Sequence, residues 1–159
     1  MISPEDRERL RAHFSYDPTT GEISRTVPYG NRCVGSVCKK DGYLYLNFAG
    51  HRMAGQRVAW FLGTGRWPQH DVAHINGVRL DNRLSNLRDV PRRHVVENIR
   101  GPNKRNSSGF LGVAQHHGKW RAQIQVGRET IVLGRFDEPA PAHAVYLRAK
   151  RQLHAGCTI

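Results

Sequence analysis

The pattern of hydrophobic and polar residues is most regular in the second half of the chain. In the stretch KWRAQIQV (119–126), apolar residues alternate with polar ones, which predicts a strand with one buried face. Residues 110–117 and 130–136 show similar patterns, and short Gly-containing turns separate the three stretches. Residues 138–154 carry apolar side chains three and four positions apart, which predicts an amphipathic helix. We therefore predict a small module of three strands and one helix.

Near the N-terminus the sequence predicts a capped helix. Ser3 can cap it, Pro4 suits its first turn, and Asp6 stands three residues after the cap. The stretch YDPTTGEISR (16–25) then predicts a turn with Gly21 at its end.

The remainder of the first half gives shorter signals. Residues 34–38 and 43–48 predict a hairpin, because the KKDG between them contains an Asp-Gly turn signal. In the stretch 51–68 apolar residues recur at helical spacing, and its GTG is expected to end that helix. A short strand over 72–75 and a short helix over 92–99 complete the prediction.

The composition indicates two small domains rather than one large core. Hydrophobic residues make up 38% of the 159 residues, which is low for a single large core. The stretch RGPNKRNSSG (100–109) has the composition of a linker. We therefore predict an α+β chain with a first domain over 1–101, a basic linker over 102–108 and a second domain over 109–159.

The chain is strongly basic. It has 25 Lys and Arg residues, most of them Arg, against 13 Asp and Glu, and a net charge of +12. Arg suits phosphates and guanine edges, so nucleic acid is the expected partner, whereas the alternative is a soluble protein that is simply basic. We expect no membrane association and no signal peptide, because no apolar stretch is long enough. Cys33, Cys38 and Cys157 form no CxxC pair, so neither a disulfide framework nor a zinc ribbon is expected, and we expect a cytoplasmic protein.

One face of the predicted central strand presents Arg121, Gln123 and Gln125 in a row. Arg and Gln side chains can bond base edges in the major groove, where a small sheet can lie. The alternative is an ordinary solvated polar face. The net charge of +12 and the two glutamines favour DNA.

The stretches SSGFLGV, GKWRAQI and LGRFDEPAPAHAVYLRA resemble the APETALA2-type DNA-binding domain of plant ethylene-response factors, which also occurs in phage homing-type nucleases. The resemblance covers residues 106–156 and implies a three-stranded antiparallel sheet that reads the major groove. The strand positions that it implies as contacts are Ala114, His116, Arg121, Gln123, Gln125, Thr130 and Val132. Several of these are Arg or Trp in the plant domains, so Ala114 and Val132 imply a different target site. Lys119 and Arg128 belong to the same predicted DNA-binding set.

The stretch HINGVRLDNRLSNLR (74–88) resembles the HNH endonucleases of the homing type, whose site is a strand-loop-strand-helix motif around one metal ion. His74 matches the general base, and Asn86, twelve residues later, matches the central Asn that orients it. The stretches YDPTTGEI and QRVAWFLGTGRWP also resemble the N-terminal half of the phage proteins. The resemblance implies a divalent cation, Mg²⁺ or Mn²⁺. Asp81 and Asn82 are expected to hold the turn rather than to bind that metal.

Two positions depart from the HNH pattern. The Asp that usually precedes the His, and that binds the metal, is Ala73 here. Asp71 lies one strand repeat away, too far to replace it without distortion. The usual ligand on the final helix falls at Val95, flanked by His94 and Asn98 on one helix face. We favour His94 as the ligand, with Asn98 beside it.

The two resemblances together imply a site-specific DNA endonuclease in the host cell of a phage. One site per chain implies a nick by a monomer, or a double-strand break by a DNA-induced dimer. The basic residues expected to hold phosphates are Arg79, Arg83, Arg92 and Arg93, and in the linker Arg100, Lys104 and Arg105. Ala73 favours an alternative, a nuclease-derived DNA-binding regulator without cleavage. RNA binding ranks third, because no pair of stacking aromatics stands in the expected strand positions.

Overall fold

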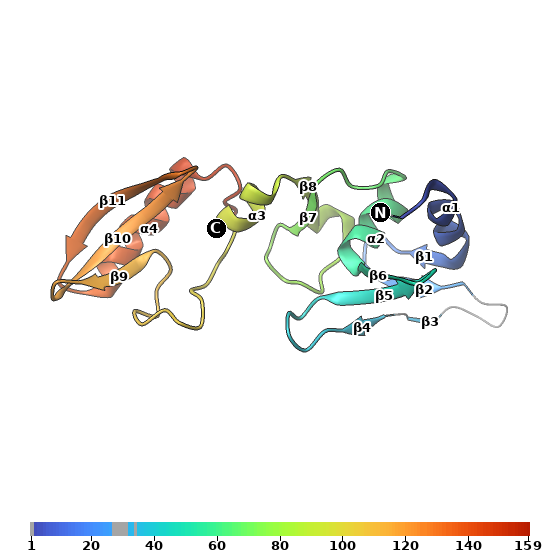
Figure 1. Cartoon of the computed structure of the whole chain (residues 1–159), viewed down its shortest axis with the longest axis horizontal. Helices are drawn as coiled ribbons and strands as arrows, with labels where there is room; N and C mark the ends of the chain where they lie inside the picture. The colour runs from blue at the N-terminus through green and yellow to red at the C-terminus, as the bar shows by residue number, and fades with distance from the viewer. Residues whose placement is uncertain (1, 27–31, 34) are drawn as a thin grey trace. The chain divides into compact units, whose positions relative to one another are not determined.

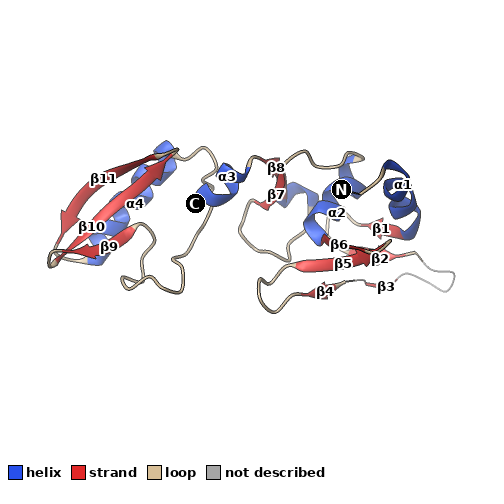
Figure 2. Cartoon of the chain, viewed as in Figure 1, coloured by secondary structure: helices blue, strands red, loops and turns tan. Residues whose placement is uncertain are grey.

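A computed structural model describes residues 2–26, 32–33 and 35–159 of the chain (Figure 1). It divides into two compact units, Met1–Pro91 and Arg92–Ile159, which are described separately below. The chain contains helices as well as small antiparallel sheets, which confirms the predicted mixture of α and β structure (Figure 2). Val34, the first residue of a predicted strand, lies outside the described residues. No helix within the described ranges is long and apolar enough to cross a bilayer.

The first unit contains two long helices and three small sheets. Its helical elements are α1 (Pro4–His13), α2 (Gly55–Thr64) and the 3₁₀ turn η1 (Leu84–Asn86). Its strands are β1 (Phe14–Tyr16), β2 (Ile23–Arg25), β3 (Arg32–Cys33), β4 (Ser36–Val37), β5 (Leu44–Phe48), β6 (His51–Ala54), β7 (Asp71–His74) and β8 (Leu87–Val90). They form the sheets β1-β2-β3, β4-β5-β6 and β7-β8.

The predicted helix ends in the first unit are confirmed. Ser3 caps α1, since its hydroxyl accepts a hydrogen bond from the Asp6 backbone N–H at 3.0 Å. The GTG stretch ends α2, where Gly65 takes the left-handed conformation with φ 76°. On the buried side of α2, Val58 and Phe61 pack into a core that also contains Leu10 of α1.

Two segments of the first unit contain strands that the sequence pattern does not indicate. The predicted turn that ends at Gly21 is the tip of a hairpin, in which β1 and β2 pair antiparallel. The stretch 51–68 was expected to be helical, but its first four residues form β6, and the helix begins at Gly55. β6 pairs with β5 through Leu46 and Met53, whose side chains are buried in the same core.

The second unit consists of α3 (Arg92–Glu97), β9 (Val113–His116), β10 (Lys119–Val126), β11 (Glu129–Phe136) and α4 (Pro139–Leu153). The three strands form an antiparallel sheet in the order β11-β10-β9, and α4 lies along one of its faces (Figure 1). The predicted strands and the predicted long helix are therefore present.

The alternation predicted for β10 is confirmed by burial. Ala122 and Ile124 are buried against α4, where they pack with Ala142 and Tyr146 respectively. The intervening residues, such as Gln125, lie on the opposite face of the sheet.

The helix α3 belongs to the second unit, so the division of the chain falls ahead of residue 101, where the sequence places the end of the first domain. The assignment of residues 1–101 to a nuclease domain and of residues 109–159 to a DNA-binding domain stays a prediction.

Candidate active site

His74 stands at the end of β7, next to the loop that leads to η1. β7 pairs antiparallel with β8, and His74 lies opposite Leu87 in that ladder. The side chain of His74 is only 6% exposed, and Val72 and Ala73 before it are also buried. The short ladder therefore fixes the imidazole in a largely dry environment.

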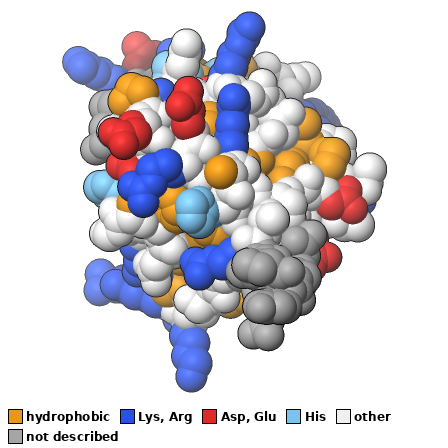
Figure 3. All heavy atoms as spheres, turned by 90° about the vertical axis from the view of Figure 1, so that its right-hand side faces the viewer, with side chains coloured by type: hydrophobic (Ala, Val, Ile, Leu, Met, Phe, Trp, Pro, Cys, Tyr) orange, Lys and Arg blue, Asp and Glu red, His pale blue; other side chains and the backbone are white. Residues whose placement is uncertain are grey.

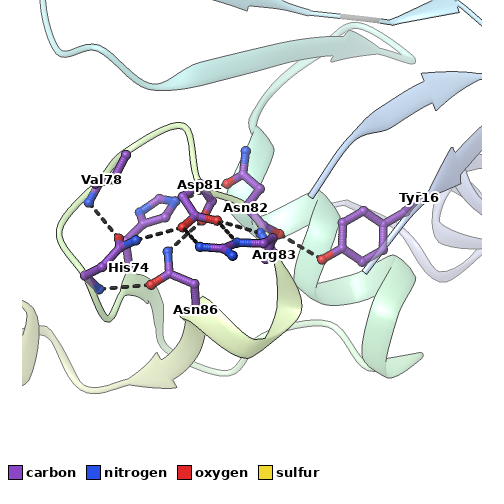
Figure 4. A network of polar contacts seen from close by, with 8 residues as sticks. Tyr16, His74, Val78, Asp81, Asn82, Arg83 and Asn86 are labelled. Carbon is purple, nitrogen blue, oxygen red and sulfur yellow. Dashed lines mark hydrogen bonds and ion pairs between the residues drawn. The ribbon is translucent and has the colours of Figure 1, made fainter. Parts of the chain in front are cut away.

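The polar partner of His74 is Asn82 (Figure 4). His74 Nε2 lies 3.1 Å from Asn82 Oδ1, and Asn82 is 2% exposed. Since an amide oxygen can only accept, Nε2 donates in this contact and Nδ1 is the basic nitrogen of the ring. Sequence analysis gave Asn82 a turn-holding role and did not identify this contact.

Asn82 is itself held by the hairpin of β1 and β2. The Tyr16 hydroxyl donates to the backbone oxygen of Asn82 at 2.8 Å (Figure 4). Gly21, with φ +80°, comes so close that a Cβ atom there would lie 2.5 Å from the backbone nitrogen of Arg83. Burial raises the pKa of Tyr16 to about 12, so this donor stays protonated at neutral pH.

Asn86 stabilises the loop between His74 and η1 rather than contacting the imidazole directly. Its Oδ1 accepts from the backbone N–H of Asn76 at 2.9 Å. Its Nδ2 donates to the backbone oxygen of Asp81 at 2.7 Å. Sequence analysis assigned to Asn86 the orientation of His74, and in the structure the amide beside the imidazole is that of Asn82.

Asp81 forms the polar centre of the loop. Its carboxylate accepts from Arg83 Nη2 at 2.5 Å and from Asn76 Nδ2 at 2.7 Å. These bonds, those from Arg83 above all, hold the pKa of Asp81 well below its usual range. The guanidinium of Arg83, predicted to hold a phosphate, is thus bound to Asp81 in this structure.

The surroundings of His74 favour its neutral form. Burial lowers the pKa of His74, while the bond to Asn82 and the charge of Asp81 partly oppose this effect. Arg79 lowers the pKa further. A neutral imidazole is the form that can accept a proton from water.

Arg79 is anchored next to this site by the turn between β4 and β5. Its Nη1 donates to the backbone oxygen of Asp41 at 2.6 Å, and its guanidinium lies 5.2 Å from the centre of the Tyr43 ring. The Tyr43 ring in turn lies 5.9 Å from the ring of His74. Arg79 is one of the residues predicted to bind phosphate, and it is linked to His74 through the ring of Tyr43.

The donor atoms needed for a divalent cation are not gathered around His74. Ala73 is 5% exposed and has no donor atom. Among the residues that the structure describes, no group of three or more His, Cys, Asp or Glu side chains could hold a metal ion. Ala73 therefore lacks the oxygen ligand that the HNH resemblance implies at this position.

The two candidate ligands on the final helix lie in the second unit. His94 Nε2 accepts from Arg93 Nε at 3.3 Å. Asn98 is buried, and its Oδ1 accepts from the backbone N–H and the hydroxyl of Thr158, at 3.2 and 2.6 Å. Their role as metal ligands stays a prediction.

The outer face of the β9–β11 sheet brings together the residues predicted to read DNA. Across the strands, Arg121 lies opposite Ala114, Gln123 opposite Val132, Gln125 opposite Thr130, and Lys119 opposite His116. Arg121 Nε is buried without a hydrogen-bond partner among the described residues. The Arg and Gln side chains of this face carry donors and acceptors suited to an external partner.

Other predicted DNA-binding residues lie around this face. Arg92, Arg93, Gln123, Gln125 and Thr130 are among the residues that line one cavity of about 850 Å³ in the second unit. Arg128 is exposed in the turn between β10 and β11, and Lys104 and Arg105 are exposed in the segment before β9. Lys119 and Arg100, which belong to the same predicted set, have protein partners: Lys119 pairs with Asp137 at 3.0 Å, and Arg100 donates to Thr158.

Comparison with protein families identifies the type of this site. Residues 54–97 match the family model described as HNH endonuclease. The match runs from the last residue of β6 to the end of α3 and includes His74, Asn82 and Asn86. No curated protein and no solved structure gives a significant match. The matched segment is thus of the HNH nuclease type.

Proposed function

We propose that this chain is a site-specific DNA endonuclease of the HNH homing type, in which the first unit carries the hydrolytic base and the second unit selects the site. The observation that carries the proposal is the buried pair of His74 and Asn82 inside the segment matching HNH endonucleases. The excess of basic residues, with a net charge of +12, supports a polyanionic substrate.

In this proposal His74 is the catalytic base. Its Nδ1 accepts a proton from a water molecule while the oxygen of that water attacks the phosphorus atom of a phosphodiester. The bond from phosphorus to one sugar oxygen then breaks, and that leaving oxygen takes up a proton from solvent. The imidazolium that forms keeps its Nε2–H bond to Asn82, and the nearby carboxylate of Asp81 stabilises the added positive charge. Arg79, anchored beside the site, would bind a phosphate of the substrate.

HNH nucleases use a divalent metal, and this chain lacks the Asp that usually binds it. Ala73 has no carboxylate that could bind the metal ion. The strand backbone that holds His74 in place cannot supply this ionic ligand. We therefore expect the chain to bind DNA but to cleave it slowly.

The test is a plasmid-nicking assay with the chain as given and with Ala73→Asp, each with Mg²⁺ and with Mn²⁺. The restored carboxylate should raise the nicking rate by orders of magnitude, and calorimetry should detect metal binding only in the variant. Equal nicking by both proteins would refute the metal assignment.

A second function, DNA binding without cleavage, is favoured by one observation. The described residues around His74 contain no cluster of metal-binding side chains, and Ala73 is buried where a ligand is expected. A regulator derived from a nuclease would bind DNA through the β9–β11 sheet alone. Specific binding together with no nicking by either protein, with either metal, would support this second function over the first.

The outer face of the β9–β11 sheet supports the site-selecting role. Arg121, Gln123 and Gln125 project from one face of β10, opposite the face that packs on α4. Such side chains can bond guanine and adenine edges in a major groove. On the face of the molecule that Figure 3 shows, Lys and Arg side chains project outward, as expected for contacts with phosphates.

A further inference from the structure

The segment after α4 is bonded to the end of α3. The Gly156 backbone N–H donates to Glu97 Oε2 at 2.7 Å. The Thr158 hydroxyl and backbone N–H both donate to Asn98 Oδ1, at 2.6 and 3.2 Å. Arg100, just beyond the helix, donates to the Thr158 backbone oxygen at 3.2 Å. These bonds connect residues about 60 positions apart in the sequence, and all lie within the second unit.

Close packing adds to these bonds at Gly156. A Cβ atom built on Gly156 would lie 2.3 Å from the backbone oxygen of His94 and 2.5 Å from its Cα. The backbone of Gly156 is not in the left-handed region, so the need for glycine here is steric. The segment therefore touches the backbone of α3 at the residue predicted to be its metal ligand.

The helix α3 depends on such outside contacts. It has six residues, none of which is buried. A helix of this length is not stable by itself, because its few hydrogen bonds do not offset the cost of nucleation. Its C-terminal end is further held by Lys150 of α4, whose ammonium donates to the backbone oxygen of Ile99. The orientation of α3 is thus set by the body of the second unit.

We infer that Gly156 and Thr158 are positioning residues for the nuclease reaction, because they fix the helix with which the HNH match ends. This inference rests on the proposed function. The match extends through residue 97, so the last helix of the matched segment is held by the same unit that carries the β9–β11 sheet. Loosening the segment should lower the rate of the chemical step and leave DNA affinity unchanged.

The test uses the full chain with Ala73→Asp, in which nicking is expected. Into this background we would introduce Gly156→Ala and, as a matched control, Gly101→Ala, because a Cβ on Gly101 has no atom within 4 Å. Gly156→Ala should lower kcat by up to about 100-fold, the scale of an ångström-sized misplacement, while KM and the affinity for matched DNA stay within about twofold of the control. Hydrogen exchange of residues 92–99 should become faster in Gly156→Ala only.

A second pair of variants keeps the test valid if Gly156→Ala folds poorly. Thr158→Val removes the hydroxyl that bonds Asn98 without adding bulk, and Thr158→Ser retains it. Thr158→Val should lower kcat, and Thr158→Ser should restore most of it.

The outcomes separate the two proposals. No nicking by the Ala73→Asp protein itself would refute the proposed function and the positioning role with it. If the Ala73→Asp protein does nick DNA, the three further variants are compared in that background. The same kcat in Gly156→Ala, Thr158→Val and the Gly101→Ala control would overturn the positioning role alone. An equal fall in DNA affinity and in kcat would also overturn it, because it would mean that the segment supports the DNA-binding sheet.

Discussion

The imidazole of His74 and the amide of Asn82 form a buried hydrogen bond of 3.1 Å, made between β7 and the loop that precedes η1. The backbone oxygen of Asn82 is bonded in turn to Tyr16, 66 residues earlier in the chain. The orientation of the candidate base therefore depends on the β1–β2 hairpin as well as on its own loop. The side-chain amide of Asn86, which matches the central Asn of the HNH pattern, bonds the backbone of the same loop at Asn76 and Asp81.

Replacing each of the two amides should give different results. In the Ala73→Asp protein, Asn82→Ala should lower the nicking rate by about 100-fold, since the ring loses the side-chain acceptor that bonds its Nε2. Because the Asn82 bond raises the pKa of His74, its loss should also move the acidic limb of the rate profile to lower pH. Rates measured between pH 4.5 and 8, chosen here to span the ordinary His pKa of about 6.5, would detect the shift.

Asn86→Ala serves as the comparison. It removes two hydrogen bonds from the loop, so we expect a loss of about 1–3 kcal/mol in the free energy of unfolding. The pH at which the rate falls should change less than in Asn82→Ala. A pH profile that moves with Asn86→Ala but not with Asn82→Ala would return the orienting role to Asn86.

Removing the base itself is the second test. His74→Ala in the Ala73→Asp protein should lower nicking by about 10²–10⁴-fold, the usual contribution of a general base. DNA affinity, measured by gel shift, should be unchanged because phosphate and base contacts remain. A double variant that cuts as fast as Ala73→Asp alone would show that His74 has a structural role only.

The burial of His74 predicts a pH dependence of stability. Its pKa is lowered in the folded protein, so between the folded value and the ordinary 6.5 the unfolded chain binds more protons. Stability is then complete above about pH 6.5 and falls as the pH drops toward the folded pKa. His74→Ala should flatten this part of the curve. Urea unfolding in a Trp120→Phe background would measure it, because Trp60 and Trp67 then report on the first unit.

In that experiment the other histidines titrate in both proteins, so the quantity compared is the difference between the two curves. Parallel curves from pH 7.5 to 5 would mean that His74 is protonated equally easily in the folded and unfolded chain. The lowered pKa, and with it the argument for a neutral base, would then be wrong.

The parts of the fold that follow from local pattern could be predicted from the sequence. The alternation in residues 119–126 is strong because one face of β10 is buried on α4 and the other is polar. β1 and β2 have three residues each, too few for any periodicity to be visible. β6 is also too short to show a strand pattern, since it has four residues and continues directly into α2.

The candidate site could be predicted only in part for a related reason. The spacing of His74 and Asn86 is a local feature of the sequence, and it indicates the correct loop. Asn82 lies on that loop and Asn86 ends the 3₁₀ turn that follows it, and no spacing rule shows which amide reaches the imidazole. That choice depends on Tyr16 and Gly21, which contact the loop from a distant hairpin.

The last test concerns the outer face of β10. Arg121 and Gln123 lie on the side away from α4, whereas Ile124 is buried against it. Arg121→Ala and Gln123→Ala should each cost about 1–3 kcal/mol in binding to the preferred DNA site and little on scrambled DNA. Ile124→Ala should instead cost about 2–5 kcal/mol of stability, because it removes core volume.

The comparison requires binding to matched and scrambled DNA, and thermal unfolding, for all three variants. A preferred site would first be obtained by selecting bound fragments from random DNA. Equal losses on both DNAs for Arg121→Ala and Gln123→Ala would place these side chains on phosphates, where they hold the duplex without reading it. A loss confined to the preferred site, with unfolding unchanged, is the result expected of side chains that bond base edges, since a mismatched base leaves their donors and acceptors unpaired.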